Sequence, residues 1–280
     1  MALDHARIAQ LFAKLDRQLG KLASKPQPKN IHQFRTVARR AETALAELVA
    51  QPDRKSRKLL KLITKLRRRA GKVRDLDVQI AALRSLKLSE QPGIKTQLVQ
   101  TMTEKRDRRE KRFLGMLDRE TVCELRRRLK NANNDLTEAA PNPQVLVRTR
   151  LAAFTNSTGA VTEKLLHHYR IEGKQIRYLA ELNGDNPEVQ RIIAELKRMQ
   201  DVLGEWHDWL TLNATVSKLL PESTNSPLRA AIHNILGAKY REAVQAVFTA
   251  KANLRKKPPA EVQSGSSENS VAVAAGRAVA

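Results

Sequence analysis

A basic motif that occurs twice constrains this chain more than any other feature. Each copy begins with a histidine and places cations at offsets 3 and 7, and the second copy adds one at offset 10. The copies are His32, Arg35 and Arg39, then His167, Arg170, Lys174 and Arg177. A second pattern, Gly-x-x-x-Asp, occurs at Gly71 and Gly204. The histidines lie 135 positions apart and the glycines 133, so we interpret the chain as an internal duplication of one helical unit.

Helix is the expected structure of both units. Ala, Leu, Arg, Lys and Glu dominate the 280 residues, and only 11 Gly and 11 Pro interrupt them. This mixture favours helix, and no segment shows the sustained alternation of a strand. Proline, glycine and capping residues predict helices over 2–23, 30–50, 53–88, 94–129, 144–154, 161–182, 187–220 and 227–254. The boundary between the units is expected at 131–143.

Helical geometry places each motif on one face of its helix. Offsets 0, 3, 7 and 10 fall within an arc of about 80°, which gives one cation per turn of about 5 Å. Beside this row lies an apolar stripe, formed by Ile31, Phe34, Ala38, Ala41, Leu45 and Leu48 in the first copy and by Leu166, Tyr169, Ile176 and Ala180 in the second. Such a row suits an anion with closely repeating charges. The alternatives are an ordinary solvated face and, for His32, a structural histidine at the core edge.

The charge balance points to a polyanionic partner. Lys and Arg number 52 against 29 Asp and Glu, so the net charge is +23. An excess of this size concentrates anions at the surface and is typical of chains that meet nucleic acid, acidic membrane or polyphosphate. Aromatic residues are only 4%, which argues against single-stranded nucleic acid, because its binders stack bases on aromatic rings. Sequence-independent binding of duplex DNA or RNA remains the second choice.

Catalytic and metal-binding motifs are not apparent, so we expect no enzyme activity, no cofactor and no metal. The sequence has no Gly-rich phosphate loop, His-Glu-x-x-His or Cys-x-x-Cys. Asp75 and Asp77 could form an acid–base pair, but we favour Asp75 and Asp208 as residues that orient neighbouring cations or bond helix ends. His207 and Asp208 are adjacent on a helix and point in different directions, which disfavours a metal site. An enzyme acting on short phosphate chains is the least favoured reading.

Location follows from two further observations. Cys123 is the single cysteine, which fits a reducing compartment. No apolar run approaches the roughly 20 residues of a membrane span. We therefore expect a cytoplasmic protein.

Four motifs in order resemble the CHAD domain, the conserved-histidine α-helical domain. The first half carries His32-x-x-Arg35-x-x-x-Arg39-Arg40 and Arg74-Asp75-Leu-Asp77. The second carries Leu166-His167-x-x-Arg170-x-x-x-Lys174-x-x-Arg177-Tyr178 and Gln200-Asp201-x-Leu-Gly204-x-x-His207-Asp208. The resemblance covers about residues 1–255.

The resemblance implies an all-α fold of two homologous antiparallel four-helix bundles, related by a pseudo-twofold axis with a basic cavity between them. Here the repeats would span 1–138 and 144–255. It also implies non-catalytic binding of inorganic polyphosphate and, in several relatives, association with polyphosphate granules. The candidate polyphosphate-binding residues are His32, Arg35, Arg39, Arg40, Arg74, His167, Arg170, Lys174, Arg177 and His207. Arginines would fork onto phosphate oxygens, Lys174 would act as a point charge, and neutral histidines would donate hydrogen bonds.

Three positions depart from the family pattern. Glu42 stands where another arginine is usual, His207 stands where an asparagine or similar residue is common, and Glu205 stands opposite Lys72 of the first repeat. These departures predict unequal contributions from the two halves. The Gly-, Ser- and Ala-rich segment 258–280 has no large apolar residue to bury and is predicted to be a disordered tail.

Overall fold

The computed structural model describes residues 5–48, 53–87, 92–135, 142–184, 186–220 and 226–256. These residues form nine α-helices and no strand, which confirms the predicted all-α class. The helices are α1 (His5–Ser24), α2 (Pro28–Leu48), α3 (Arg54–Ser85), α4 (Pro92–Leu114), α5 (Arg119–Asp135), α6 (Pro143–Asn156), α7 (Glu163–Ala180), α8 (Pro187–Leu219) and α9 (Pro227–Arg255). The expected tail, 258–280, lies outside the described residues.

Local capping explains where several helices begin. The side chain of Asp53 accepts a hydrogen bond from the Ser56 amide at the start of α3. Asn142 and Asn186 cap α6 and α8 in the same way, and each precedes a proline in the first turn. Proline suits this position because its missing N–H has no helical partner there. The predicted starts of these helices therefore follow from short-range chemistry.

The helix predicted over 94–129 is instead two helices, and this prediction was wrong. α4 ends at Leu114, and α5 begins at Arg119. Gly115 lies in the break, and the Asp118 carboxylate accepts a hydrogen bond from the Thr121 amide at 2.7 Å. An aspartate that satisfies a free amide stabilises a new helix start. Gly115 and Asp118 together were the signal for this break.

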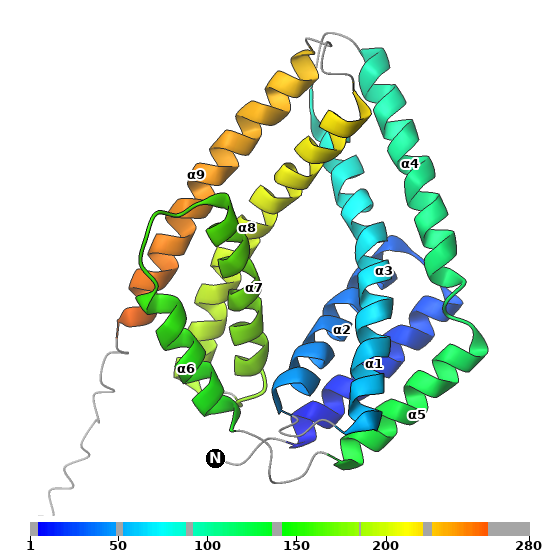
Figure 1. The fold of residues 1–280 in the computed structure, drawn as a ribbon, viewed down its shortest axis with the longest axis vertical. Coiled ribbons are helices and arrows are strands. Elements are labelled where there is room, and N and C mark those ends of the chain that lie inside the picture. The colour runs from blue at the N-terminus through cyan, green and yellow to red at the C-terminus, as the bar shows by residue number, and fades with distance from the viewer. Residues whose placement is uncertain are drawn as a thin grey trace, which may run out of the picture.

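The packing order of the first four helices recurs in the last four. α1 packs on α2, α2 on α3 and α3 on α4, and the same succession runs from α6 to α9. The first half also contains α5, which packs on α1 and α3. This recurrence agrees with an internal duplication, whereas the pseudo-twofold axis stays a prediction. Figure 1 shows the two halves side by side, with α1–α5 on the right and α6–α9 on the left.

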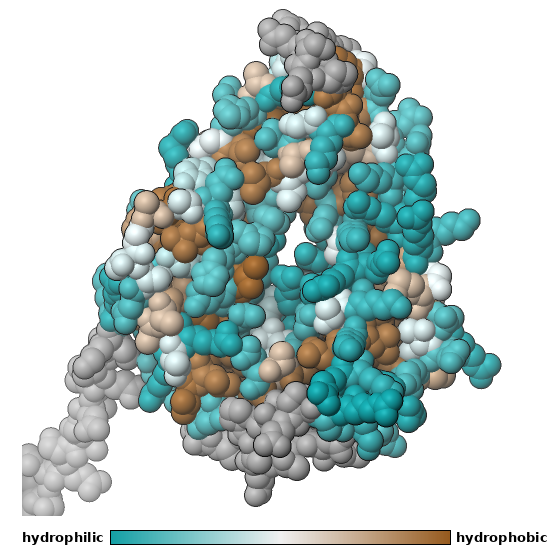
Figure 2. Space-filling model, in the orientation of Figure 1, coloured by the Kyte–Doolittle hydropathy of each residue, from teal (hydrophilic) through white to brown (hydrophobic). Residues whose placement is uncertain are grey.

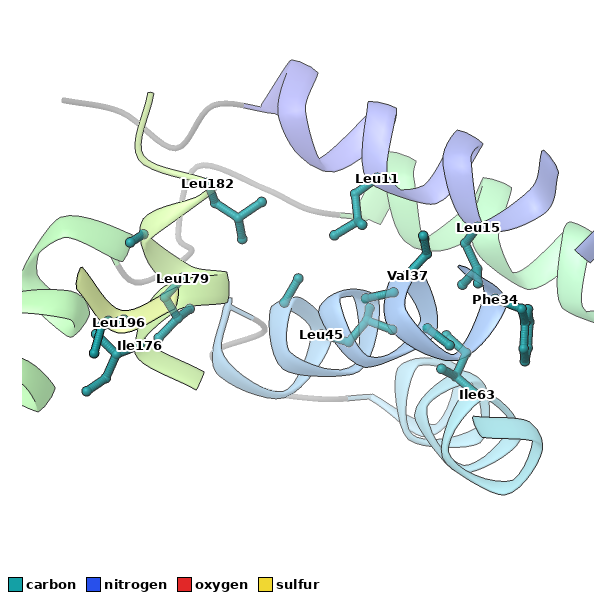
Figure 3. Close-up of a cluster of buried hydrophobic side chains, with 14 of the residues drawn as sticks. Leu11, Leu15, Phe34, Val37, Leu45, Ile63, Ile176, Leu179, Leu182 and Leu196 are labelled. Carbon is teal, nitrogen blue, oxygen red and sulfur yellow. The ribbon is translucent and has the colours of Figure 1, made fainter. Parts of the chain in front are cut away.

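The larger apolar core runs across both halves. The apolar stripes predicted for α2 and α7 are buried in it; Phe34, Leu45 and Ile176, for example, are at most 4% exposed. Figure 3 shows side chains of the two halves, including Leu45 and Leu179, in this one cluster. α2 packs mainly on α1 and α3, and α7 packs mainly on α6 and α8, so the apolar face of each motif helix is covered. α2 also packs on α7, which brings the two rows of cations to one junction.

A second apolar cluster joins the halves at the other end of the molecule. It is formed by Leu76, Ile80, Leu83, Leu86, Leu98, Met102, Leu212, Val216, Leu228 and Ile232. These residues come from the end of α3, the start of α4, the end of α8 and the start of α9. Figure 2 shows an opening through the molecule between the two halves, with a mainly hydrophilic rim. None of the described helices combines the length and apolarity needed to cross a bilayer.

Candidate anion-binding site

The junction of α2 and α7 brings the two predicted rows of cations into one cluster. Arg35 and Arg39 lie on α2, whereas Arg170 and Lys174 lie on α7, and the two helices pack together. The pKa of Lys174 is lowered first by burial and then by the charges of Arg170, Arg39, Arg35 and Arg177. Residues 135 positions apart in the duplication therefore share one electrostatic field. We call Arg35, Arg39, Arg170 and Lys174 the cation cluster.

Arg35 explains the glycine of the first Gly-x-x-x-Asp motif. A Cβ atom added to Gly71 would lie 3.3 Å from Arg35 Nε, so the glycine lets the arginine lie close against α3. The next acidic residue of the motif, Asp75, has its Oδ1 3.7 Å from Arg35 Nη2. This contact agrees with the orienting role predicted for Asp75. The second-repeat glycine, Gly204, has open space around it.

The cluster has more positive charge than its neighbours neutralise. Burial, followed by the charges of neighbouring cations, lowers the pKa of Lys174 to about 6. Burial and then the charges of Arg67 and Arg35 lower the pKa of Arg39 to about 10. In the part of the chain that the structure describes, Nε of Arg35 and Nε of Arg170 are buried without a hydrogen-bond partner. Charged side chains crowded in this way would be stabilised by an anion that accepts their hydrogen bonds.

Three histidines surround the cluster as neutral groups. His32 and His167 are exposed, while His207 on α8 is partly buried. The rings of His167 and His207 have centroids 5.4 Å apart. Burial, then the charges of Arg170 and His167, lowers the pKa of His207 to about 3, and its Nδ1 is buried without a partner among the described residues. Burial also lowers the pKa of His32, with contributions from Arg74 and Arg35, which places Arg74 beside this end of the cluster.

Besides Arg35, two more of the predicted binding residues have a carboxylate partner. Arg40 donates two hydrogen bonds to Glu181, Nε to Oε2 at 2.5 Å and Nη2 to Oε1 at 3.1 Å. Arg177 Nε lies 3.5 Å from Glu181 Oε1. Both guanidinium groups lie over the ring of Tyr178, at 5.2 and 5.1 Å from its centroid. Arg40 therefore helps to hold α2 against the end of α7, whereas Arg177 pairs with the C-cap residue of its own helix, α7. The charges of both arginines are partly neutralised.

Glu42 has a partner that the sequence did not suggest. Its carboxylate pairs with Arg67 of α3 and accepts a hydrogen bond from Thr64 Oγ1 at 2.7 Å. The departure from the family pattern at this position is thus offset by a nearby cation. Arg67 precedes Gly71 by four residues and Arg74 by seven, a spacing that places all three on one face of α3. That spacing was the available signal for Arg67.

The aspartates of the two Gly-x-x-x-Asp motifs lie within the same field. Burial raises the pKa of Asp208, Arg170 opposes this rise, and the charge of Asp75 adds to it. Both carboxylates thus act on, and are influenced by, the cation cluster. Across the described residues, no group of three or more His, Cys, Asp or Glu side chains could hold a metal ion.

A pocket of about 310 Å³ adjoins the cluster. Arg39, Arg67 and Lys174 line it together with Glu42 and Tyr178. Chemically, the arrangement offers arginine guanidinium groups that can each donate two hydrogen bonds, the ammonium group of Lys174 and neutral imidazole donors over several helical turns. Such donors suit an anion with several acceptor oxygens.

Comparison with known proteins decides the family. The CHAD domain model matches residues 6–217 of the sequence. The chain belongs to the CHAD domain family. This CHAD domain retains the four motifs described above, including both leading histidines. No match was found among curated proteins.

Two solved structures share the CHAD fold of this chain. The CHAD domain from the plant Ricinus communis is 16% identical, with a TM-score of 0.66, and the similarity covers 91% of each chain. PptA from Streptomyces chartreusis is 14% identical, with a TM-score of 0.59 and coverage of 92% of this chain and 100% of that one. At these identities the likeness concerns the fold.

Proposed function

We propose that this CHAD protein binds inorganic polyphosphate at the cation cluster and catalyses no reaction on it. The observation that carries the proposal is the convergence of Arg35 and Arg39 with Arg170 and Lys174 from the other repeat. Burial, followed by the charges of the neighbouring arginines, lowers the pKa of Lys174 to about 6, and Nε of Arg35 and of Arg170 are buried without a hydrogen-bond partner among the described residues. A chain of linked phosphates supplies closely spaced negative charge and many acceptor oxygens, which matches these donors.

Family membership supports the same ligand, because CHAD domains are associated with polyphosphate. The adjoining pocket, of about 310 Å³, is lined by Arg39, Arg67 and Lys174, which a chain of phosphates could contact together. Association with polyphosphate granules would follow from such binding, and localisation of a fluorescently tagged protein in granule-forming cells tests it.

The proposed lack of catalysis is tested by measuring orthophosphate release from polyphosphate with Mg²⁺ or Mn²⁺.

The central experiment compares a double variant in the cluster with a matched pair elsewhere. Arg170→Ala/Lys174→Ala removes an arginine and a lysine four residues apart on α7, and Arg17→Ala/Lys21→Ala removes the same pair from the exposed face of α1. Charge-assisted hydrogen bonds contribute about 1.5–3 kcal/mol each, so the cluster variant should lose at least about tenfold in polyphosphate affinity. The control should lose less than about twofold, because Arg17 and Lys21 lie on α1 and do not belong to the cation cluster or line its pocket.

Equal losses in the two variants would show that binding follows total charge and that no discrete site exists. Circular dichroism and thermal unfolding of each variant establish that it is folded.

Competition with duplex DNA at physiological salt, at equal phosphate concentration, separates the two ligand classes. Polyphosphate should displace the DNA; displacement in the opposite direction would make nucleic acid the preferred ligand.

A further inference from the structure

The outer face of α3 carries a row of cations that the proposed site does not use. Arg54, Lys58, Lys61, Lys65, Arg68 and Lys72 follow one another at intervals of four and three residues. We call these six residues the α3 stripe. At about 100° per residue they occupy an arc of about 80°, and at about 1.5 Å per residue the row is about 27 Å long.

The α3 stripe is both exposed and unneutralised. All six side chains are exposed, and among the residues that the structure describes none of them forms an ion pair. Some exposed arginines elsewhere are neutralised; Arg126 pairs with Asp16, and Arg127 pairs with Glu124. An unbroken row of unpaired cations keeps a high local concentration of anions along its whole length.

The stripe lies next to the pocket that adjoins the cation cluster, because a hollow on α3 and that pocket share two lining residues. A shallow hollow on α3 is lined by Lys61, Lys65, Arg68 and Lys72, and its wall also includes Leu60 and Thr64. Leu60 and Thr64 also line the 310 Å³ pocket, whose opposite wall carries Arg39 and Lys174. One anion could therefore contact the cluster, pass through the pocket and continue along α3.

We propose that the α3 stripe is a second binding surface for polyphosphate, which takes the part of a long chain that extends beyond the cation cluster. The inference rests on the proposed function and adds a dependence on chain length to it. Lysine ammonium groups on flexible stems act as point charges, so the stripe can follow a phosphate chain in any register.

The test uses two triple variants and two ligands. Lys61→Ala/Lys65→Ala/Arg68→Ala removes three cations of the stripe. Lys14→Ala/Arg17→Ala/Lys21→Ala removes two lysines and one arginine over the same seven-residue interval of α1, where they are also exposed. Affinities are measured for long-chain polyphosphate and for tripolyphosphate, which is too short to occupy both surfaces.

The stripe variant should bind long-chain polyphosphate about tenfold more weakly than the unmodified protein, since each exposed charge pair contributes modestly. Its affinity for tripolyphosphate should change by less than about twofold, as should the affinities of the α1 control. The slope of log affinity against log salt for the long chain should fall by about two units, because three phosphate contacts are lost at about 0.7 each.

Three outcomes would overturn the inference. The stripe variant could bind long-chain polyphosphate as tightly as the unmodified protein. The α1 control could lose as much affinity as the stripe variant, or the stripe variant could lose affinity for duplex DNA alone, which would make the stripe a nucleic-acid surface. Failure of the proposed function is a separate result, in which the unmodified protein binds neither polyphosphate nor tripolyphosphate.

Discussion

At the scale of single residues, Lys174 couples binding to protonation. Its pKa of about 6 means that it is largely neutral near pH 8 and largely charged below pH 6. A phosphate chain beside it favours the charged form and raises the pKa, so binding should take up protons near neutral pH. We expect polyphosphate affinity to increase as the pH falls from about 8 to about 6, and calorimetry in buffers of different ionisation enthalpy to detect the proton uptake.

The Lys174→Arg variant isolates this contribution. Arginine stays charged throughout this range, so proton uptake should fall to the part supplied by His32 and His167. The pH dependence of the free energy of unfolding tests the lowered pKa of Lys174 independently of binding. Because the folded pKa lies below the unfolded value of 10.5, the unfolded state binds more protons between about pH 6 and 10.5, and stability should rise with pH there. Lys174→Met should flatten that rise; an unchanged slope would contradict the assignment.

At the scale of helices, the two motif glycines should respond differently to substitution. Gly204 has open space around it, so Gly204→Ala should raise the free energy of unfolding by up to about 1 kcal/mol through helix propensity. In Gly71→Ala the new Cβ would lie 3.3 Å from Arg35 Nε, so Arg35 must shift. Chemical denaturation should show a smaller gain or a loss for Gly71→Ala, and its polyphosphate affinity should fall. Equal gains in both variants would show that Arg35 does not depend on this approach.

At the scale of the whole molecule, the halves should unfold together. The larger apolar core includes residues of α2 and α7, and the second cluster joins α3 and α4 to α8 and α9. Leu83 is fully buried in the second cluster, so Leu83→Ala should lower the free energy of unfolding by about 2–5 kcal/mol. Calorimetry should show a single transition that moves to lower temperature. Two separate transitions in the unmodified protein would mean that each half folds independently.

The sequence predicted the helical class and the buried face of each motif helix, because both depend on short-range periodicity. Phe34 and Ile176 are buried as that periodicity required. It did not predict the pairing of Glu42 with Arg67 or of Arg40 with Glu181. Those contacts depend on how α2 crosses α3 and α7, and crossing geometry is set by long-range packing. The break at Gly115 was missed because the charged sequence around it suits a helix on either side.

The opening between the halves has a topological consequence. The two halves bound it at the sides, and an apolar cluster joins them at each end. The protein therefore forms a closed ring around the opening. A polymer that passes through a closed ring must thread by one of its ends, whereas a polymer on an open groove can land anywhere along its length. Threading would make capture depend on the number of chain ends and would let a captured chain leave only by sliding out.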